Sequence, residues 1–319
     1  VTVTGRLGRP GECVYGIIEE TGTAVIEMAG AAGLALISKE ERNPLHTTTY
    51  GVGEVIRDAI LKGCRRFIVG IGGSATNDGG VGMLQALGYG FLDREGKQVP
   101  FGAEGLKQLS MITDESVLEQ LSECEFRIAC DVTNRLCGEN GCSVVYGPQK
   151  GADSFMIAQM DEWLAHYAAL AKEKYPGADD CKPGTGAAGG LGFAFLTFTN
   201  AVLESGVKIV MEETHLEKYI KGADVVITGE GRLDGQTVMG KAPAGVAALA
   251  KKHGVLVIAL AGSVSGDASL CNQHGIDAFF PILQDVVTLE EAMETEGAKR
   301  NLANTAEQVL RLVRLSEKM

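Results

Sequence analysis

The last third of the chain has the most regular pattern of apolar and polar segments. Nearly continuous apolar runs predict buried strands at residues 223–228, 255–261 and 278–283. Helical periodicity lies between and after these runs, at residues 242–253, 268–274, 289–293 and 298–315. Strands that alternate with helices predict a parallel sheet covered by helices. Three strands make a thin sheet, so we expect further strands from earlier in the chain or from sequence absent here.

The first two thirds of the chain are less regular. Short apolar runs predict strands at residues 24–27, 67–71, 126–129 and 207–211. Helical periodicity predicts helices at residues 53–62, 155–175 and 193–203. Long glycine-containing loops separate these segments, which fits one uniform array of strands and helices poorly. We therefore expect an α/β fold with two domains, a mixed α/β domain at residues 1–217 and a parallel α/β domain at residues 218–319.

A glycine-rich turn follows the predicted strand at residues 67–71 and leads into a predicted helix at residues 81–87. Such a turn presents unpaired backbone N–H groups and the positive end of the helix dipole, which favours binding of an anion at Gly72, Gly73 and Ser74. The carboxylate of Asp78 would repel a phosphate unless a divalent cation or a hydroxyl proton lay between them. This combination indicates phosphoryl transfer.

A second polar segment closes the predicted strand at residues 126–129. Asp131 and Asn134 are oxygen-bearing side chains at a strand's carboxyl end, where α/β proteins bind ligands. Turn chemistry of Asp and Asn explains the same residues equally well. Lys150 follows in the segment 146–152 and is either a phosphate ligand or a solvated lysine.

The segment PGTGAAGGLG at residues 183–192 contains the spacing G-x-G-x-x-G. A dinucleotide site of this type needs a strand just before the first glycine, and polar residues precede it here. No acidic residue ends a second strand at the required distance either. We therefore do not expect a dinucleotide site, and the glycines, Gly186 among them, serve either close approach to a ligand or tight packing at a helix start.

A third segment follows the predicted strand at residues 223–228. Glu230, Arg232, Asp234 and Lys241 place both signs of charge in one glycine-rich loop. Open parallel sheets bind ligands at this end of their strands, which favours a functional site. Residues 235–241 spell G-x-x-x-x-G-K, but Ala242 stands where a P-loop needs Ser or Thr, so a standard P-loop is excluded.

Composition and charge narrow the function classes. The chain has 319 residues and a formal net charge of −12, which argues against nucleic acid or an anionic membrane as partner. No apolar run approaches the about 20 residues that a membrane-spanning helix needs. Eight cysteines without a C-x-x-C pair argue against zinc and predict reduced thiols in a cytoplasmic protein.

Five segments together resemble the bacterial glycerate kinase family of the glyoxylate and glucarate pathways. They are GIGGSATNDGG at residues 70–80, CDVTN at 130–134, GPQKGA at 147–152, PGTGAAGGLG at 183–192 and VITGEGRLD at 226–234. Weaker similarity at residues 3–8 and 43–49 extends the resemblance over essentially the whole chain. Arg135, Cys142 and Tyr146 depart from the residues usual in the family, and Arg135 adds a charge beside Asn134.

The resemblance implies a fold and a missing segment. Members of this family have a flavodoxin-like domain that is split in the sequence, with a second α/β domain inserted into it. They begin with a strand and two further motifs ahead of the position that matches Val1. The resemblance therefore implies that this chain lacks an N-terminal segment, which would supply the further strands of the thin sheet.

The resemblance also implies a reaction, the transfer of the γ-phosphoryl group of ATP, with Mg²⁺, to D-glycerate, for this branch at the 2-hydroxyl. On this basis Asp78 is the predicted base or metal ligand, with Asp131 as its rival. Arg232 and Lys241 are predicted to stabilise phosphate or the substrate carboxylate, and Glu230 and Asp234 to hold Mg²⁺. The predicted nucleotide-binding residues are Gly72, Gly73, Ser74, Asn77, Asn134, Lys150, Gly186, Gly229, Gly231 and Thr237.

Three other functions stay open at this point. They are a kinase for another small hydroxy acid, an inactive truncated fragment, and an NAD-dependent oxidoreductase, which the context of the glycine motif disfavours. The expected partner is a small-molecule substrate rather than nucleic acid or a membrane, and a homo-oligomer is left open.

Overall fold

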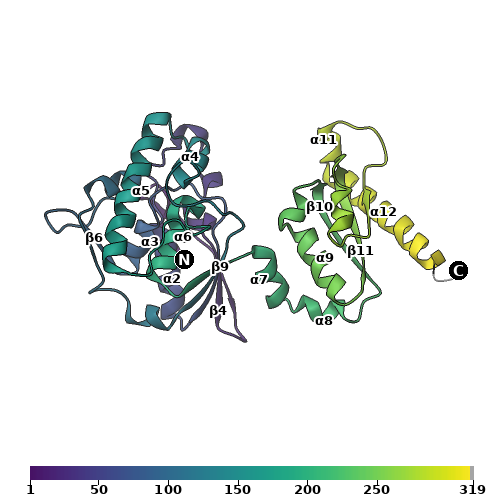
Figure 1. The fold of residues 1–319 in the computed structure, drawn as a ribbon, viewed down its shortest axis with the longest axis horizontal. Coiled ribbons are helices and arrows are strands. Elements are labelled where there is room, and N and C mark those ends of the chain that lie inside the picture. Colours follow the sequence, from purple (N-terminus) through teal and green to yellow (C-terminus); the bar gives the residue numbers. More distant parts are fainter. Residues whose placement is uncertain (317–319) are drawn as a thin grey trace. The chain divides into compact units, whose positions relative to one another are not determined.

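The computed structural model describes residues 1–316, and the chain divides into two compact units. Unit 1 is Val1–Gly206 and unit 2 is Val207–Met319. Figure 1 draws unit 1 from purple to teal and unit 2 from green to yellow. Each unit has its own hydrophobic core, and each is described here by itself.

Unit 1 is built on a five-stranded sheet with the order β3-β4-β5-β8-β9. The strands are β3 Gly16–Ile18, β4 Thr23–Glu27, β5 Arg66–Gly70, β8 Glu125–Ala129 and β9 Ala201–Glu204. β3 is antiparallel to β4, and every other neighbouring pair in this sheet is parallel. Gly70 of β5 is paired with Ala129 of β8. The predicted site segments that follow these two strands therefore start side by side.

Helices and two small antiparallel sheets complete unit 1. The helices are α1 Ala29–Ala32, α2 Tyr50–Leu61, α3 Val81–Ala86, α4 Cys142–Tyr146, α5 Ser154–Lys174 and α6 Ala187–Phe198. The small sheets pair β1 Thr2–Thr4 with β2 Pro10–Glu12, and β6 Gly90–Leu92 with β7 Met111–Thr113. Short 3-10 helices lie at Leu34–Leu36, Lys39–Glu41, Ala103–Gln108, Glu119–Glu123 and Pro148–Lys150. The rings of Phe67 and Phe126 stack across β5 and β8 with centroids 4.6 Å apart.

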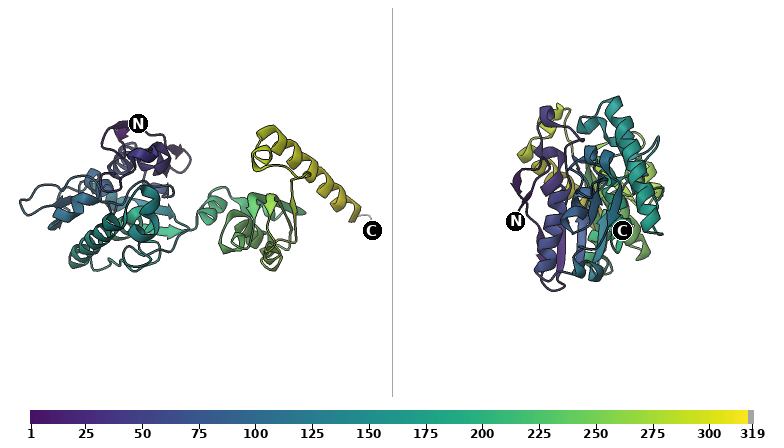
Figure 2. Two further views of the ribbon diagram at one scale, coloured as in Figure 1. Left: turned by 90° about the horizontal axis from the view of Figure 1, so that it is seen from above. Right: turned by 90° about the vertical axis from the view of Figure 1, so that its left-hand side faces the viewer.

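Unit 2 is a three-stranded parallel sheet, as the alternation of apolar runs and helices predicts. Its strands are β10 Val225–Leu233, β11 Leu256–Val264 and β12 Ala278–Pro281. Its helices are α7 Gly206–Glu213, α8 Leu216–Ile220, α9 Ala242–Lys252, α10 Leu270–Gln273, α11 Leu289–Ala292 and α12 Thr295–Ser316, with a 3-10 turn at Thr237–Met239. The left view of Figure 2 shows α12 as one long helix near the yellow end of the colour scale.

Both faces of the central strand β11 are buried. Val257, Ala259 and Ala261 belong to one apolar cluster, which also contains Ala247 of α9. Ile258 and Leu260, which point to the opposite face, form another cluster with Val309 of α12. Burial on both faces explains why this strand reads as a continuous apolar run in the sequence.

Three predicted elements differ from the structure. Residues 207–211 are not a strand but lie in α7, where Val207 packs beside Gly245 of α9. The two compact units divide after Gly206, and the domain boundary predicted at residue 217 stays a prediction. The helix predicted at residues 193–203 ends at Phe198, because Ala201–Glu204 pair with β8. Strand β10 continues to Leu233 and includes residues that we predicted to lie in a loop.

Two further sequence predictions concern membrane spans and cysteines. Within residues 1–316, no helix is long and apolar enough to cross a membrane. All eight cysteines are free thiols, in agreement with the prediction. The predicted flavodoxin-like topology, with its insertion, stays a prediction.

Candidate active site

The glycine-rich turn after β5 presents a row of unpaired backbone donors. Two backbone hydrogen bonds hold the turn against residues 32–34. They run from Leu34 N to Gly73 O (2.8 Å) and from Ala75 N to Ala32 O (2.9 Å). Gly73 has a φ of +72°, which a residue with a side chain rarely adopts. Within residues 1–316, the N–H groups of Gly72, Gly73 and Ser74 have no hydrogen-bond acceptor. Consecutive free amides of this kind form an anion-binding concavity.

Lys150 adds a positive charge next to this turn. It ends the short helix Pro148–Lys150 and is only 2% exposed. Its Nζ donates hydrogen bonds to Ser74 Oγ (2.9 Å) and to Thr76 O (2.6 Å). Burial lowers the pKa of Lys150 to about 8, because the charged ammonium is poorly solvated there. Lys150 is therefore a buried cation and not the solvated lysine that the sequence left open.

The turn and Lys150 line one pocket of about 560 Å³ in unit 1. Asp131, which follows β8, contributes an exposed carboxylate to the same pocket, and its Oδ1 accepts a hydrogen bond from Gly206 N at 3.2 Å. The structure thus brings five predicted site residues together: Gly72, Gly73, Ser74, Asp131 and Lys150. It adds lining residues that the sequence reasoning missed, among them Tyr146 and Gln149, both in the segment 146–152.

Asp78 does not lie in this pocket. Its side chain is buried, and its carboxylate accepts hydrogen bonds from Thr49 N, Thr49 Oγ1, Gly80 N and Gly82 N at 2.8, 2.9, 3.1 and 3.4 Å. Burial raises the pKa of Asp78, while these hydrogen bonds oppose the rise. The carboxylate joins the start of α2 to the start of α3. Burial of the carboxylate among these donors favours a structural role, and the role of Asp78 as base or metal ligand stays a prediction.

Three predicted nucleotide-binding residues of unit 1 support neighbouring loops instead of lining the pocket. Asn77 Nδ2 donates to Ser143 Oγ at 2.8 Å. Asn134 Oδ1 accepts a hydrogen bond from Tyr146 OH at 2.6 Å, and Asn134 O accepts one from Gly186 N at 2.9 Å. A Cβ atom on Gly186 would lie 2.2 Å from the carbonyl oxygen of Arg135, so this glycine serves close backbone packing.

The glycines of PGTGAAGGLG pack against the turn that follows β5. Ala188, Gly189 and Gly190 are all left-handed, with φ values of 52°, 68° and 95°. Gly79 N donates to Gly189 O at 3.0 Å, and a Cβ on Gly189 would lie 2.0 Å from Thr76 O. The sequence left open whether these glycines serve close approach to a ligand or tight packing. The structure shows tight packing, because Gly189 lets two backbone segments touch. Ala188 itself lines the pocket.

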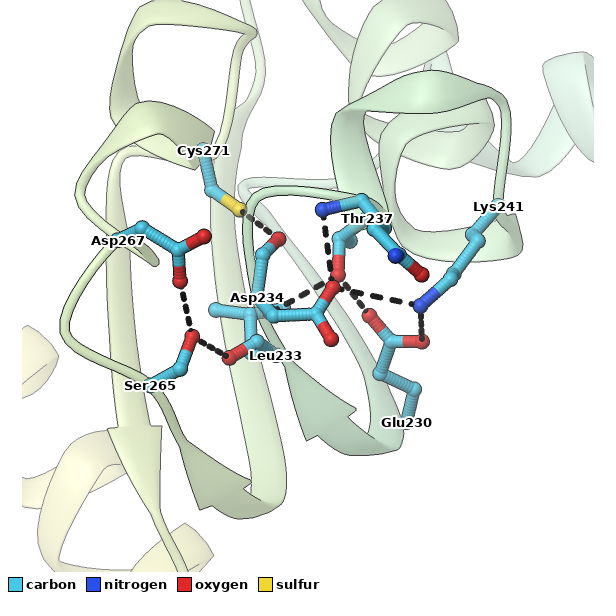
Figure 3. Close-up of polar contacts among 9 residues, drawn as sticks. Glu230, Leu233, Asp234, Thr237, Lys241, Ser265, Asp267 and Cys271 are labelled. Carbon is cyan, nitrogen blue, oxygen red and sulfur yellow. Dashed lines mark hydrogen bonds and ion pairs between the residues drawn. The ribbon is translucent and has the colours of Figure 1, made fainter.

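Unit 2 carries a second group of charged residues at the end of β10 (Figure 3). Glu230 and Arg232 lie on the strand itself rather than in a loop. The Lys241 ammonium points toward two carboxylates, with its Nζ 3.9 Å from Glu230 Oε2 and 3.4 Å from Asp234 Oδ1. The buried Thr237 hydroxyl donates to Glu230 Oε1 and accepts a hydrogen bond from Asp234 N at 3.2 Å. Four predicted residues thus converge here.

The end of β11 adds two residues that the sequence reasoning missed. Ser265 Oγ lies within hydrogen-bonding distance of Asp267 Oδ1 and of Leu233 O. The hydrogen bond from Ser265 lowers the pKa of Asp267, with a smaller contribution from the positive charge of Arg232. Both residues follow the carboxyl end of a predicted strand, and that position was the signal that could have found them.

The remaining predicted residues of unit 2 differ in their surroundings. A Cβ on Gly229 would lie 2.2 Å from Leu260 O, so Gly229 allows β10 and β11 to pair closely. No atom lies within 4 Å of the corresponding position on Gly231. In the part of the chain that the structure describes, the exposed Arg232 makes no hydrogen bond or ion pair. Its guanidinium is therefore available to an anion.

Comparisons with known proteins agree on one family. Residues 1–314 match the model of the Glycerate kinase family. The chain is 46% identical to the glycerate 2-kinase of Escherichia coli K12 over 96% of this chain and 80% of that protein. It is 45% identical to the glycerate kinase of Bacillus subtilis 168, over 99% and 82% of the two chains. A crystal structure described as glycerate kinase 2 from Salmonella typhimurium LT2 matches with a TM-score of 0.89 and 42% identity, covering all of this chain and 83% of that one.

Proposed function

This chain belongs to the glycerate kinase family, and from this membership we propose that it transfers the γ-phosphoryl group of ATP to D-glycerate. Membership makes it a kinase that uses a nucleotide and a small-molecule acceptor. The near-full-length likeness to proteins named glycerate kinase carries the proposal. We further propose that the acceptor is the 2-hydroxyl and the product 2-phosphoglycerate, which the name of the Escherichia coli relative supports.

The charged end of β10 is the proposed site for Mg²⁺ and the nucleotide phosphates. Glu230 and Asp234 both face the Lys241 ammonium, and carboxylate oxygens are the ligands that Mg²⁺ prefers. Mg²⁺ bound there would neutralise charge on the transferred phosphoryl group. Lys241 and the free guanidinium of Arg232 would hold phosphate oxygens.

Asp131 is the proposed general base. It is the only carboxylate among the described residues that line the unit 1 pocket, and it is exposed there. One of its oxygens accepts the Gly206 amide, which orients the side chain and leaves the other oxygen for a substrate hydroxyl. Accepting the hydroxyl proton as the oxygen attacks phosphorus is the role such a carboxylate has in kinases.

The test is magnesium-dependent release of ADP by the purified chain with D-glycerate, with the product identified by phosphorus NMR. We expect turnover that requires Mg²⁺ and a phosphate ester at carbon 2. An ester at carbon 3 would contradict the proposed position of transfer. Turnover with other hydroxy acids but not with glycerate would contradict the proposed substrate, and a folded chain without turnover would contradict the reaction.

A matched pair of variants tests the metal assignment. Glu230→Gln removes one carboxylate of the proposed Mg²⁺ site and keeps its size, so we expect the Mg²⁺ concentration for half-maximal rate to rise about tenfold. Glu290→Gln makes the same change on an exposed helix of unit 2 and should leave this concentration unchanged. Equal magnesium requirements for Glu230→Gln and the unaltered chain would contradict the assignment.

A further inference from the structure

We propose that the pocket of unit 1 binds the carboxylate of the hydroxy acid, with the Gly72, Gly73 and Ser74 amides and the Lys150 ammonium as its ligands. This inference rests on the proposed function, because it assumes one hydroxy-acid and one nucleotide substrate. It assigns the glycine-rich turn to the acceptor substrate, whereas such a turn would ordinarily be given to the nucleotide phosphates.

The first argument is the unmatched charge of Lys150. An ammonium group is costly to bury unless an anion accompanies it. In the part of the chain that the structure describes, Lys150 forms no ion pair, and its two acceptors are a hydroxyl and a carbonyl oxygen. Asp78 attracts it from a distance, but that carboxylate is already occupied by four donors. A ligand that brings one negative charge would complete the site.

The second argument is the number of donors. An ammonium group has three N–H bonds, and two of those of Lys150 are used within the protein. The third N–H bond has no acceptor among the described residues, nor have the amides of Gly72, Gly73 and Ser74, so residues that line the same pocket carry four unused donors. A carboxylate has two oxygens with about four lone-pair sites. The donor set therefore matches one carboxylate.

The third argument is the charge balance of the whole pocket. ATP carries several negative charges, and kinases hold them with metal ions and more than one cation. The described lining of this pocket offers one cation, Lys150, and one carboxylate, Asp131, which would repel a triphosphate. A hydroxy acid has the complementary pattern, because its carboxylate suits Lys150 while its hydroxyl suits Asp131. At the end of β10, Arg232 and Lys241 lie beside Glu230 and Asp234, so the nucleotide would bind there as its Mg²⁺ complex, whose metal ion offsets the charge of the carboxylates.

Direct binding of each substrate distinguishes the two assignments. We would measure dissociation constants for D-glycerate and for a non-hydrolysable Mg²⁺–ATP analogue by calorimetry, on the unaltered chain and on Lys150→Met. We expect the affinity for D-glycerate to fall about 30-fold, the loss typical of one charge-assisted contact, with nucleotide affinity within about twofold. Lys107→Met, at an exposed lysine of unit 1, is the control and should change neither constant.

The opposite result would overturn the inference without touching the proposed function. If Lys150→Met weakened the nucleotide and spared D-glycerate, the pocket would belong to the nucleotide while the enzyme remained a glycerate kinase. If the unaltered, folded chain bound the nucleotide but no glycerate, the proposed substrate itself would fail. Glyceramide, the uncharged analogue of glycerate, should bind the unaltered chain and Lys150→Met about equally weakly, and a difference between them would contradict the carboxylate contact.

The pH dependence of binding provides a second readout that needs no stable Lys150→Met protein. Burial lowers the pKa of Lys150 to about 8, so the ammonium of the empty pocket is lost above that pH. Affinity for D-glycerate in the unaltered chain should therefore fall about tenfold per pH unit above that pKa. A Lys150→Arg variant keeps its charge and should show no such fall. Affinity that is independent of pH between 7 and 10 in the unaltered chain would contradict the inference.

Discussion

Asp78 and Asp131 are two carboxylates of unit 1 with opposite surroundings. Asp78 is buried and accepts four hydrogen bonds, whereas Asp131 is exposed in the pocket. Asp78→Asn places amide hydrogens against backbone donors, so we expect the free energy of unfolding to fall by about 2–4 kcal/mol. Asp131→Asn should change it by less than about 0.5 kcal/mol and lower kcat about 100-fold.

Urea unfolding and steady-state kinetics of both variants check this pair of expectations. An Asp78→Asn variant with unchanged stability and lost turnover would support the predicted catalytic role of Asp78. An Asp131→Asn enzyme with full kcat would remove Asp131 from the role of base.

Lys150 predicts a stability profile with a defined direction in pH. Its pKa is about 8 in the folded chain and 10.5 as an ordinary lysine, so between these values the unfolded chain holds a proton that the folded chain has released. The free energy of unfolding therefore rises with pH across this window. The Lys150→Met variant has no such group. The difference in free energy of unfolding, unaltered chain minus variant, should therefore increase from pH 8 to pH 10.5. A constant difference in urea unfolding across this range would contradict the prediction.

At the residue scale, the sequence predicted which residues line the pocket better than it predicted which side chains are buried. It identified Gly72, Ser74, Asp131 and Lys150 as site residues, and the structure brings them to one pocket. It could not tell that Asp78 is buried and bonded to Thr49, because Thr49 lies 29 positions away in the chain. Likewise, only the folded chain surrounds Lys150 with the turn after β5.

At the scale of elements, the contact between PGTGAAGGLG and the turn after β5 predicts a large glycine effect. Gly189→Ala adds a Cβ 2.0 Å from Thr76 O and forces a side chain into a left-handed residue. We expect it to lower the free energy of unfolding by about 3 kcal/mol or more. Gly63→Ala, also left-handed but with no atom within 4 Å, should cost about 1 kcal/mol. Equal losses in urea unfolding would show that backbone conformation, rather than close packing, determines the glycine at 189.

The elements of unit 2 were predictable because β11 is buried on both faces and reads as one apolar run. The segment at residues 207–211, wrongly predicted as a strand, is mostly apolar but short, and its length did not separate strand from helix. The end of β10 was missed because glycine and charged residues resemble a loop, although pairing with β11 continues to Leu233. Such a continuation depends on the partner strand and cannot be found in local sequence.

At the scale of the whole molecule, the two units have separate cores, which predicts separable unfolding. The sole tryptophan, Trp163, lies in α5, so its fluorescence reports on unit 1 alone. Val257→Ala removes methyl groups from the core of unit 2 and should cost about 2 kcal/mol there. We expect the circular dichroism transition in urea to broaden or shift while the fluorescence midpoint stays the same. A fluorescence midpoint that moves with the variant would show that both units unfold as one.

The pairing of β10 with β11 through Leu233 also limits how the length of this segment can vary. Loops accept insertions, but side chains on a paired strand alternate between its two faces. One residue inserted before Glu230 would send Glu230 and Arg232 to the opposite face, unless the strand bulged to absorb it. Homologues that keep the activity should therefore differ in the residue types of this segment far more often than in its length. The spacing from Val225 to Leu233 is therefore as much a part of the proposed site as the side chains themselves.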